Sequence, residues 1–125
     1  MCSSDLMVFD APAVAAALAK GGALVRASDV FVSGSHRDAA GRVEVHDHEL
    51  DVFYIVEGSA TFVTGGTMVG GTRPRPGQWL GTDIVGGTVH TLAKGDVVVV
   101  PAKTPHWFKQ VQTPISYFTV KVITP

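Results

Sequence analysis

The sequence has a single cysteine, little charge of either sign, and no hydrophobic run long enough to cross a membrane. Cys2 is alone among 125 residues, so an internal disulfide and a cluster of thiolate metal ligands are both excluded. Charged residues make up 17% of the chain, and the formal net charge is −1 with histidine neutral. Because the lysines and arginines are scattered, we expect no nucleic-acid partner. Because no hydrophobic run is long enough to span a membrane, we expect no membrane partner.

The composition that remains is typical of one globular domain. Hydrophobic residues make up 46% of the chain, which favours a packed core over disorder. Near the N-terminus, Asp10 is a typical N-cap, Pro12 follows it early, and Gly21 is a typical stop. Residues 11–20 are therefore predicted to form a short helix. The alternative is that this alanine-rich stretch is the remnant of an export signal.

Two expectations follow from the N-terminal stretch. We divide the chain into an N-terminal segment with the short helix, residues 1–22, and a single β-barrel domain, residues 23–125. We expect a cytoplasmic location by default, and a secreted or periplasmic one if an export signal is missing from this chain.

The residues after position 22 have a pattern typical of β-strands. Short runs rich in Val, Phe, Thr and Tyr alternate with Gly and Pro. Many short strands without intervening helices predict an all-β antiparallel barrel or sandwich. Glu57-Gly58 and Lys94-Gly95 are predicted to be hairpin turns. The predicted strands are residues 23–25, 30–35, 42–48, 51–57, 59–64, 87–92, 96–100, 107–111 and 115–122.

Residues 65–87 interrupt this pattern with clustered glycines and two X-Pro steps. We predict a long loop, which is either a passive insertion or a segment that shapes substrate access or a dimer interface. Trp79 favours the second interpretation, because a large aromatic side chain in such a loop normally packs on something. Trp79 is therefore a candidate substrate-binding residue, suited to stack on a sugar ring.

Two histidines lie one residue apart in the stretch VEVHDHELDVFYIVEG, residues 43–58. On a continuous strand, His46 and His48 share a face with their Cα atoms about 6.6–7 Å apart, which allows both rings to reach one metal ion. Asp51 starts the next predicted strand and is placed to return a carboxylate to the same ion. Two histidines and a carboxylate with open positions suit iron-type oxygen chemistry. The alternative is a solvated strand end.

The stretch GDVVVVPAKTPHWFKQ, residues 95–110, places His106 in an apolar setting after a turn, a strand and a proline. With this stretch the chain resembles a cupin, a small antiparallel β-barrel of jelly-roll type. The cupin motif G-x5-P-x-G-x2-H-x3-N is matched, with Lys in the second glycine place and Gln in the asparagine place, by Gly95, Pro101, Lys103, His106 and Gln110.

The first cupin motif, G-x5-H-x-H-x3or4-E-x6-G, is matched with departures by Gly41, His46, His48, Asp51 and Gly58. The spacing from Gly41 to His46 is one residue short. The spacing from His48 to the acid is also short, and the acid is Asp in place of Glu. The resemblance covers about residues 23–122.

The resemblance implies that His46, His48 and His106 are metal ligands and that Asp51 holds the fourth position. Because both its side chain and its spacing are short, Asp51 is expected either to touch the metal or to hydrogen-bond a ligand. Three histidines without a carboxylate favour copper, zinc or nickel over iron or manganese. We expect one divalent or redox-active transition metal per chain, with copper or iron favoured. A cupin that has lost its metal is the alternative.

Strand alternation selects the residues expected to line a substrate cavity. Phe53 shares a face with Asp51, and Phe108 shares a face with His106, so both rings are predicted to line it. His90 is a further candidate at the barrel mouth, with an exposed position as the alternative.

A second layer is expected outside the barrel. Val43 and Val45 are apolar although they face away from His46, so we expect the N-terminal segment or a second subunit to cover them. Cupins commonly pair as dimers, and a homodimer is expected here.

Three classes of function suit such a site, and the fold does not choose among them. The first is a metal-dependent oxidoreductase that uses dioxygen or peroxide on a small organic or carbohydrate substrate, and we favour it. The second is a redox-neutral isomerase, lyase or hydrolase that uses the metal as a Lewis acid. The third is a ligand-binding cupin without turnover.

Overall fold

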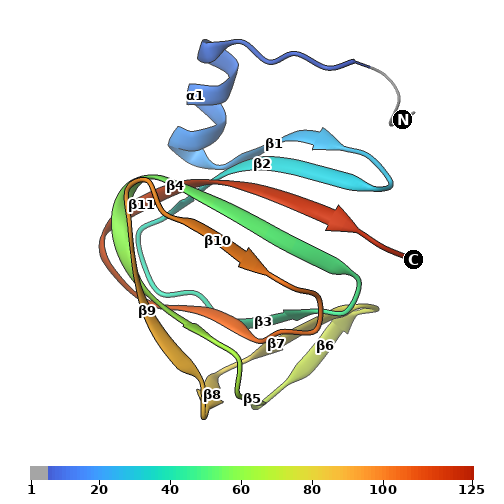
Figure 1. Cartoon of the computed structure of the whole chain (residues 1–125), viewed down its shortest axis with the longest axis vertical. Coiled ribbons are helices and arrows are strands. Elements are labelled where there is room, and N and C mark those ends of the chain that lie inside the picture. The colour runs from blue at the N-terminus through green and yellow to red at the C-terminus, as the bar shows by residue number, and fades with distance from the viewer. Residues whose placement is uncertain (1–5) are drawn as a thin grey trace.

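The computed structural model describes residues 6–125 as an antiparallel β-barrel with one short helix outside it (Figure 1). The all-β prediction with a short N-terminal helix is confirmed. Met1 to Asp5 of the predicted N-terminal segment lie outside the described residues. The elements are α1 (Ala11–Lys20), β1 (Gly22–Arg26), β2 (Val30–Arg37), β3 (Val43–His46), β4 (Glu49–Thr64), β5 (Thr67–Val69), β6 (Thr72–Arg75), β7 (Gln78–Gly81), β8 (Asp83–Val85), β9 (Thr88–Ala93), β10 (Val97–Val100) and β11 (His106–Ile123).

The helix begins and ends where the sequence predicts. Asp10 caps α1, its Oδ1 accepting a hydrogen bond from the Ala13 amide at 3.0 Å, and Gly21 ends the helix with φ +79°. The helix lies against β2 at Gly34, where a side chain would clash with the Ala17 backbone. Among the described residues, no helix is long and apolar enough to span a membrane.

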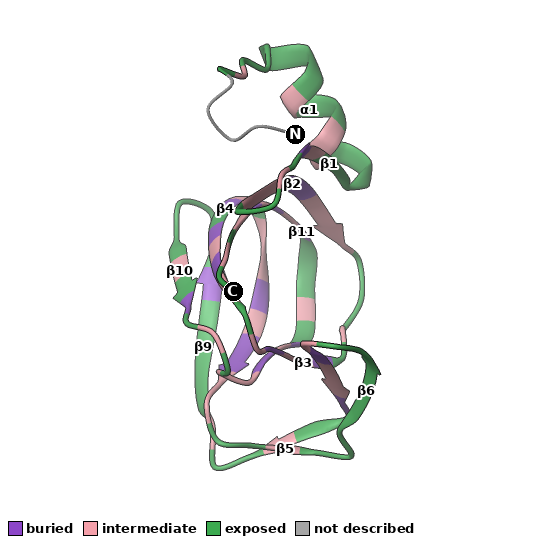
Figure 2. Ribbon diagram, turned by 90° about the vertical axis from the view of Figure 1, so that its right-hand side faces the viewer, coloured by how far each residue is buried: buried purple, intermediate pink, exposed green. Residues whose placement is uncertain are grey.

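The two longest strands, β4 and β11, pair with each other along most of their lengths. Each pairs with a different further strand in its two halves. Residues 51–54 of β4 pair with β10, whereas residues 59–64 pair with β9. Likewise, residues 115–122 of β11 pair with β2, whereas His106 pairs with β3. Figure 2 shows buried residues spread along the barrel strands, whereas the helix is largely exposed.

The ribbon of β4 and β11 bends at its middle, where the sequence had predicted a hairpin turn. That prediction is wrong: Gly58 lies inside β4 with φ +87° and packs directly against the backbone of Pro114 in β11. The two strands predicted over residues 107–122 are likewise one strand, with register shifts around its bend. Because of the bend, the His106 end and the Asp51 end of the ribbon face each other across the interior.

The other turn behaves differently. Lys94-Gly95 is a turn between β9 and β10, as predicted. The two strands that it joins each pair with β4, at different places along its length.

Residues 65–87 are not the long loop that the sequence predicts. They form four short strands: β5 pairs with β8, and β6 pairs with β7. Strand β7 also pairs with β3, so β6 and β7 are part of the main sheet, whereas β5 and β8 form a separate two-stranded sheet. Glycines at positive φ, including Gly66, Gly70 and Gly77, make the tight turns between these strands.

The same segment covers the outer side of β3. Trp79 and Met68 lie with Val45 around a shallow surface pocket, and Val43 is fully buried within one chain. Met68 and Trp79 of the same chain thus supply part of the expected second layer beside Val45. A second subunit over this face stays a prediction.

The barrel core is aromatic and aliphatic, but its inner face becomes polar towards one end. On β11, Tyr117, Thr119 and Lys121 point inward in alternation, opposite Ile55, Phe53 and Asp51 of β4. The core side chains are Phe53, Ile55, Ala60, Phe62, Leu92, Val100, Phe108, Ile115 and Tyr117. The polar end lies beyond Phe53.

The bend supplies a stability test. Gly58→Ala places a methyl group against the Pro114 carbonyl in addition to straining a positive-φ position, whereas Gly95→Ala strains φ +93° with no atom within 4 Å. We expect Gly58→Ala to lower the free energy of unfolding by about 2 kcal/mol more than Gly95→Ala, measured by urea denaturation. Equal losses for the two variants would show that the bend is not held by this close contact.

Candidate metal centre

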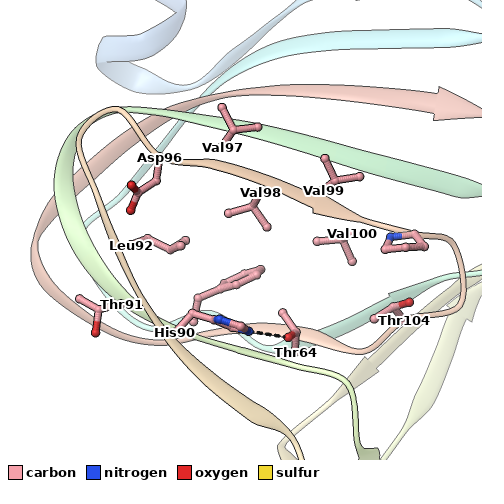
Figure 3. Close-up of a pocket in the computed structure, with 12 residues that line it drawn as sticks. Thr64, His90, Thr91, Leu92, Asp96, Val97, Val98, Val99, Val100 and Thr104 are labelled. Atoms are coloured by element: carbon pink, nitrogen blue, oxygen red, sulfur yellow. Dashed lines mark hydrogen bonds between the residues drawn. The ribbon is translucent and has the colours of Figure 1, made fainter.

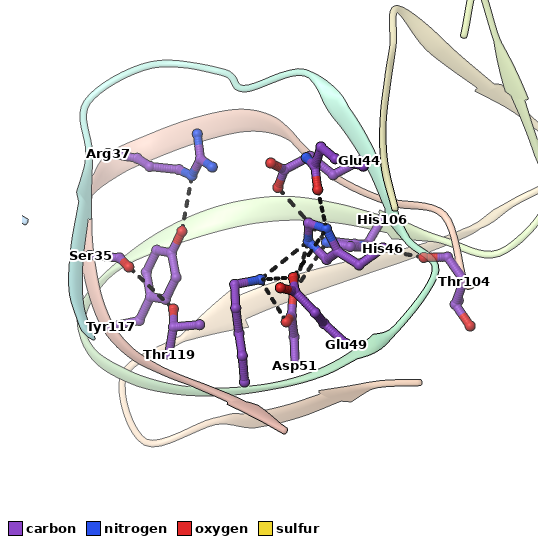
Figure 4. Close-up of polar contacts among 12 residues, drawn as sticks. Ser35, Arg37, Glu44, His46, Glu49, Asp51, Thr104, His106, Tyr117 and Thr119 are labelled. Atoms are coloured by element: carbon purple, nitrogen blue, oxygen red, sulfur yellow. Dashed lines mark hydrogen bonds and ion pairs between the residues drawn. The ribbon is translucent and has the colours of Figure 1, made fainter. Parts of the chain in front are cut away.

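Four strands bring the polar side chains of the interior together. Strand alternation places Glu44 and His46 of β3 on one face, and the register sets Glu44 opposite His106 of β11. On the other side of β3, His46 lies opposite Gln78 of β7. Asp51 approaches from β4, across the bend of the long ribbon. The resulting cluster is drawn in Figure 4.

Each buried histidine is held by a hydrogen bond at Nδ1. His46 Nδ1 lies 2.5 Å from Gln78 Oε1, and His106 Nδ1 lies 3.0 Å from the Thr104 carbonyl oxygen. These oxygens accept hydrogen bonds, so each ring donates its proton at Nδ1. When a ring is neutral, its lone pair is then at Nε2, the nitrogen that lies beside Asp51. Histidines that bind metals in proteins are usually oriented in this manner.

Asp51 joins the two rings. Its Oδ2 lies 3.3 Å from His46 Nε2 and 3.5 Å from His106 Nε2, and its side chain is 2% exposed. Two ligand atoms on one tetrahedral ion are separated by about 3.3 Å when each lies about 2.0–2.1 Å from the ion. His106 Nε2 is buried without a hydrogen-bond partner among residues 6–125. This unpaired nitrogen beside a carboxylate fits a metal ligand.

Two glutamates complete the cluster. Glu44 Oε2 lies 3.8 Å from His106 Nε2, and Glu49 Oε1 lies 3.6 Å from His46 Nδ1. Within the described chain, two groups offer ligand atoms that all lie within 4.8 Å of one another. The first is Glu44, His46 and His106; the second is His46, Glu49 and Asp51.

The sequence prediction missed both glutamates. Glu44 precedes His46 by two residues in the same strand, so strand alternation alone would have placed it on the histidine's face. Glu49 lies just beyond the strand predicted over residues 42–48, and it was not among the predicted ligands. In the structure it begins β4, two residues before Asp51.

The carboxylates of the cluster shift the pKa values of the groups around them. Burial raises the pKa of the Asp51 carboxyl, but the His106 and His46 rings and the Lys121 ammonium outweigh burial and hold that pKa well below its usual range. Burial lowers the pKa of His46, yet the adjacent Asp51 carboxylate more than compensates, so the pKa is raised. Both shifts show that this part of the interior favours positive charge.

His48 does not join this cluster. Strand β3 ends at His46, and His48 lies exposed in the bend before β4, next to Gly77. The predicted shared face of His46 and His48 requires a strand through both residues, and that expectation is wrong because the bend intervenes. His48 borders a small adjoining cavity of about 90 Å³, which Glu49 and Gln78 also line.

Two cavities open onto the cluster. The inner one, about 180 Å³, is lined by Phe53 and Phe108, as predicted from strand alternation, together with Asp51. The outer one, about 370 Å³, is lined by His46 and residues from several strands. Glu44 and Lys121 line both cavities, so the two cavities meet at the cluster.

The other two predicted substrate residues lie elsewhere. Trp79 is on the outer side of β7, where its indole Nε1 donates to Asp47 Oδ2 at 3.2 Å and the Arg73 guanidinium lies over the ring. His90 is exposed on β9, its Nε2 2.9 Å from Thr64 Oγ1. It borders a cavity of about 490 Å³ between β9 and β10 (Figure 3). The structure does not bring either side chain to the cluster.

Comparison with known proteins identifies the fold. No family model matches the chain, and no curated protein matches it. A protein with a double-stranded β-helix domain from Klebsiella pneumoniae is similar over 95% of this chain and 91% of its own, with TM-score 0.62 and 16% identity. A cupin protein from Bacteroides fragilis is similar over 99% and 87%, with TM-score 0.58 and 13% identity.

An enzyme is also among the similar structures. The DMSP lyase DddQ from Ruegeria pomeroyi aligns with 77% of this chain and 39% of its own, with TM-score 0.53 and 16% identity. At these identities the likeness concerns the fold. The chain therefore has the cupin, or double-stranded β-helix, fold, and its interior carries a His, Glu and Asp cluster consistent with a metal site.

The geometry separates the histidines experimentally. We expect His46→Ala and His106→Ala each to raise the Kd for Zn²⁺ at least tenfold, about 1.4 kcal/mol, because each removes a buried nitrogen of the cluster. His48→Ala is the matched control and should leave the Kd unchanged. Isothermal titration calorimetry on the metal-free protein measures all three. A loss in His48→Ala as large as that in His106→Ala would contradict the assigned site.

Proposed function

We propose that the protein is a metal-dependent cupin oxidoreductase that uses dioxygen or peroxide on a small organic substrate. The observation that carries the metal dependence is the unpaired, buried Nε2 of His106, which lies 3.5 Å from the carboxylate of Asp51. A buried nitrogen of this kind is costly unless a partner arrives. A metal ion is the partner that the neighbouring His46 and carboxylates would share with it.

The donor set favours iron or manganese among the expected metals. In one candidate group His46 and His106 supply nitrogen and Glu44 supplies oxygen, and the Asp51 carboxylate lies 3.5 Å from His106 Nε2. This set is closer to a two-histidine carboxylate site than to three histidines. Such an ion, when bound and redox-active, supplies the activation of dioxygen or peroxide. The chain's own residues orient the two rings through Gln78 and the Thr104 carbonyl.

The inner cavity sets the size and polarity of the substrate. A cavity of about 180 Å³ accommodates a small molecule. Its wall combines the rings of Phe53 and Phe108 with the hydroxyls of Ser33, Ser35 and Thr119. Arg37 also lines it, with its Nε donating to the Tyr117 hydroxyl at 3.0 Å. We propose a small polar substrate with an apolar portion, in place of a polysaccharide.

A redox-neutral lyase is the second candidate, and Glu44 favours it. Glu44 lines both cavities beside His106, and its half-buried carboxylate is placed to remove a proton from a substrate in the inner cavity. The likeness to a lyase of the same fold supports this alternative.

One experiment separates the two candidates. Protein purified without added metal is analysed for bound metal, then incubated with a panel of small organic acids, alcohols and aldehydes on an oxygen electrode. We expect bound iron or manganese, and oxygen uptake that His106→Ala abolishes. Product formation at an unchanged rate under nitrogen would contradict the oxidoreductase and favour the lyase.

We also propose that the protein forms a homodimer through strand β10. Within the described chain β10 pairs with β4, so the other edge of β10 is free to pair. Val97 and Val99 of this strand are 61% and 56% exposed. Four consecutive valines carry no charge, so two copies of this edge pair antiparallel with valine facing valine.

The dimer is tested by light scattering coupled to size exclusion. We expect Val99→Lys to yield a monomer, because the edge would then carry a charge into the interface. Val85→Lys, at an equally exposed valine on β8, should keep the dimer. A monomeric wild type, or a dimeric Val99→Lys, would contradict the proposed interface.

A further inference from the structure

Lys121 is a cation inside the barrel that the sequence prediction did not place there. The alternation of Tyr117, Thr119 and Lys121 along β11 turns every second side chain inward, and the register sets Lys121 opposite Asp51. The lysine side chain is 20% exposed. Because an ammonium in such a position loses hydration, it requires specific partners.

The ammonium of Lys121 contacts every member of one of the two candidate ligand groups. Nζ lies 2.8 Å from Asp51 Oδ1, 3.3 Å from Glu49 Oε1 and 3.3 Å from His46 Nε2. These are the residues whose ligand atoms gather within 4.8 Å of one another. The ammonium therefore uses the donors that a metal ion on this side would need.

The second group remains open. It consists of Glu44, His46 and His106, and His106 Nε2 lacks a hydrogen-bond partner in the described chain. His46 belongs to both groups, and its Nε2 has a single lone pair. A metal ion that binds this nitrogen must therefore displace the lysine contact.

We propose that Lys121 is a built-in competitor of the metal ion. Its ammonium neutralises Asp51 and Glu49 in the metal-free protein, and it moves off His46 when a divalent ion binds beside His106. The intact protein consequently binds the ion more weakly than the same cluster would without the lysine. This inference rests on the proposed metal-dependent function and adds the residue that sets the affinity of its site.

A positioning role for Lys121 predicts a change of metal affinity in the opposite direction. If Lys121 served only to hold the Asp51 carboxylate in position for the metal, its removal would weaken metal binding. Measuring the direction of the change therefore decides between competitor and positioning residue.

The test is calorimetric titration of the metal-free full chain with Zn²⁺ and with Mn²⁺. Lys121→Met removes the charge and keeps much of the side-chain length, and Lys121→Gln retains a donor for Asp51. We expect both variants to bind each ion at least tenfold more tightly than the wild type. Lys109→Met is the control, because Lys109 is exposed on the same strand over Trp107, and its affinity should be unchanged.

A thermal melt supplies a second readout. Without metal, Lys121→Met should melt below the wild type, because Asp51 and Glu49 lose their counter-charge. On addition of Zn²⁺ its melting temperature should rise more than that of the wild type, since tighter binding to the folded state stabilises it more. If the Met variant does not fold, the Gln variant gives the affinity.

The outcomes separate this inference from the proposed function. Equal or weaker binding by both Lys121 variants, with binding lost in His106→Ala, overturns the competitor role and leaves the metal site standing. Failure of the wild type and of both variants to bind either ion overturns the competitor role and the metal-dependent function together.

Discussion

The pairing of β4 with β11, and its bend at Gly58, is the constraint on which the site depends. The two strands pair along most of their lengths, so His106 and Asp51 lie near opposite ends of one ribbon. A straight ribbon would hold these ends apart. The bend closes the ribbon into a barrel and leaves 3.5 Å between the His106 ring nitrogen and the Asp51 carboxylate. The positive φ of Gly58 thus permits the bend that brings the buried polar side chains together.

The closure concentrates negative charge in a place where water has little access. Asp51 is almost fully buried, and Glu44 and Glu49 flank the two rings. Buried carboxylates require a cation. Lys121 supplies one for part of the cluster, and His106 Nε2 has no hydrogen-bond partner among the described residues. The buried carboxylates therefore explain both the lysine in the interior and the proposed metal ion beside His106. The same charges affect the stability of the barrel and its chemistry.

Sequence patterns predicted those parts of the site that strand alternation and motif spacing determine. Alternation placed Phe53 with Asp51, and the spacing after Pro101 pointed to His106. His48 was assigned wrongly to the face of His46 because the end of a strand is set by its neighbours: β7 pairs with β3 as far as His46, and a bend follows. Lys121 was missed because its distance to Asp51 depends on register between strands 70 residues apart.

The central claim is that a divalent ion binds between His46, His106 and Asp51. Anomalous diffraction from crystals of the protein soaked in Mn²⁺ or Zn²⁺ tests it most directly, because it locates the ion without reference to activity. The account predicts one strong anomalous peak within ordinary ligand distance, about 2.0–2.2 Å, of His46 Nε2, His106 Nε2 and an Asp51 carboxylate oxygen. A peak at His48, or a metal-free cluster in crystals soaked at saturating concentration, would contradict it.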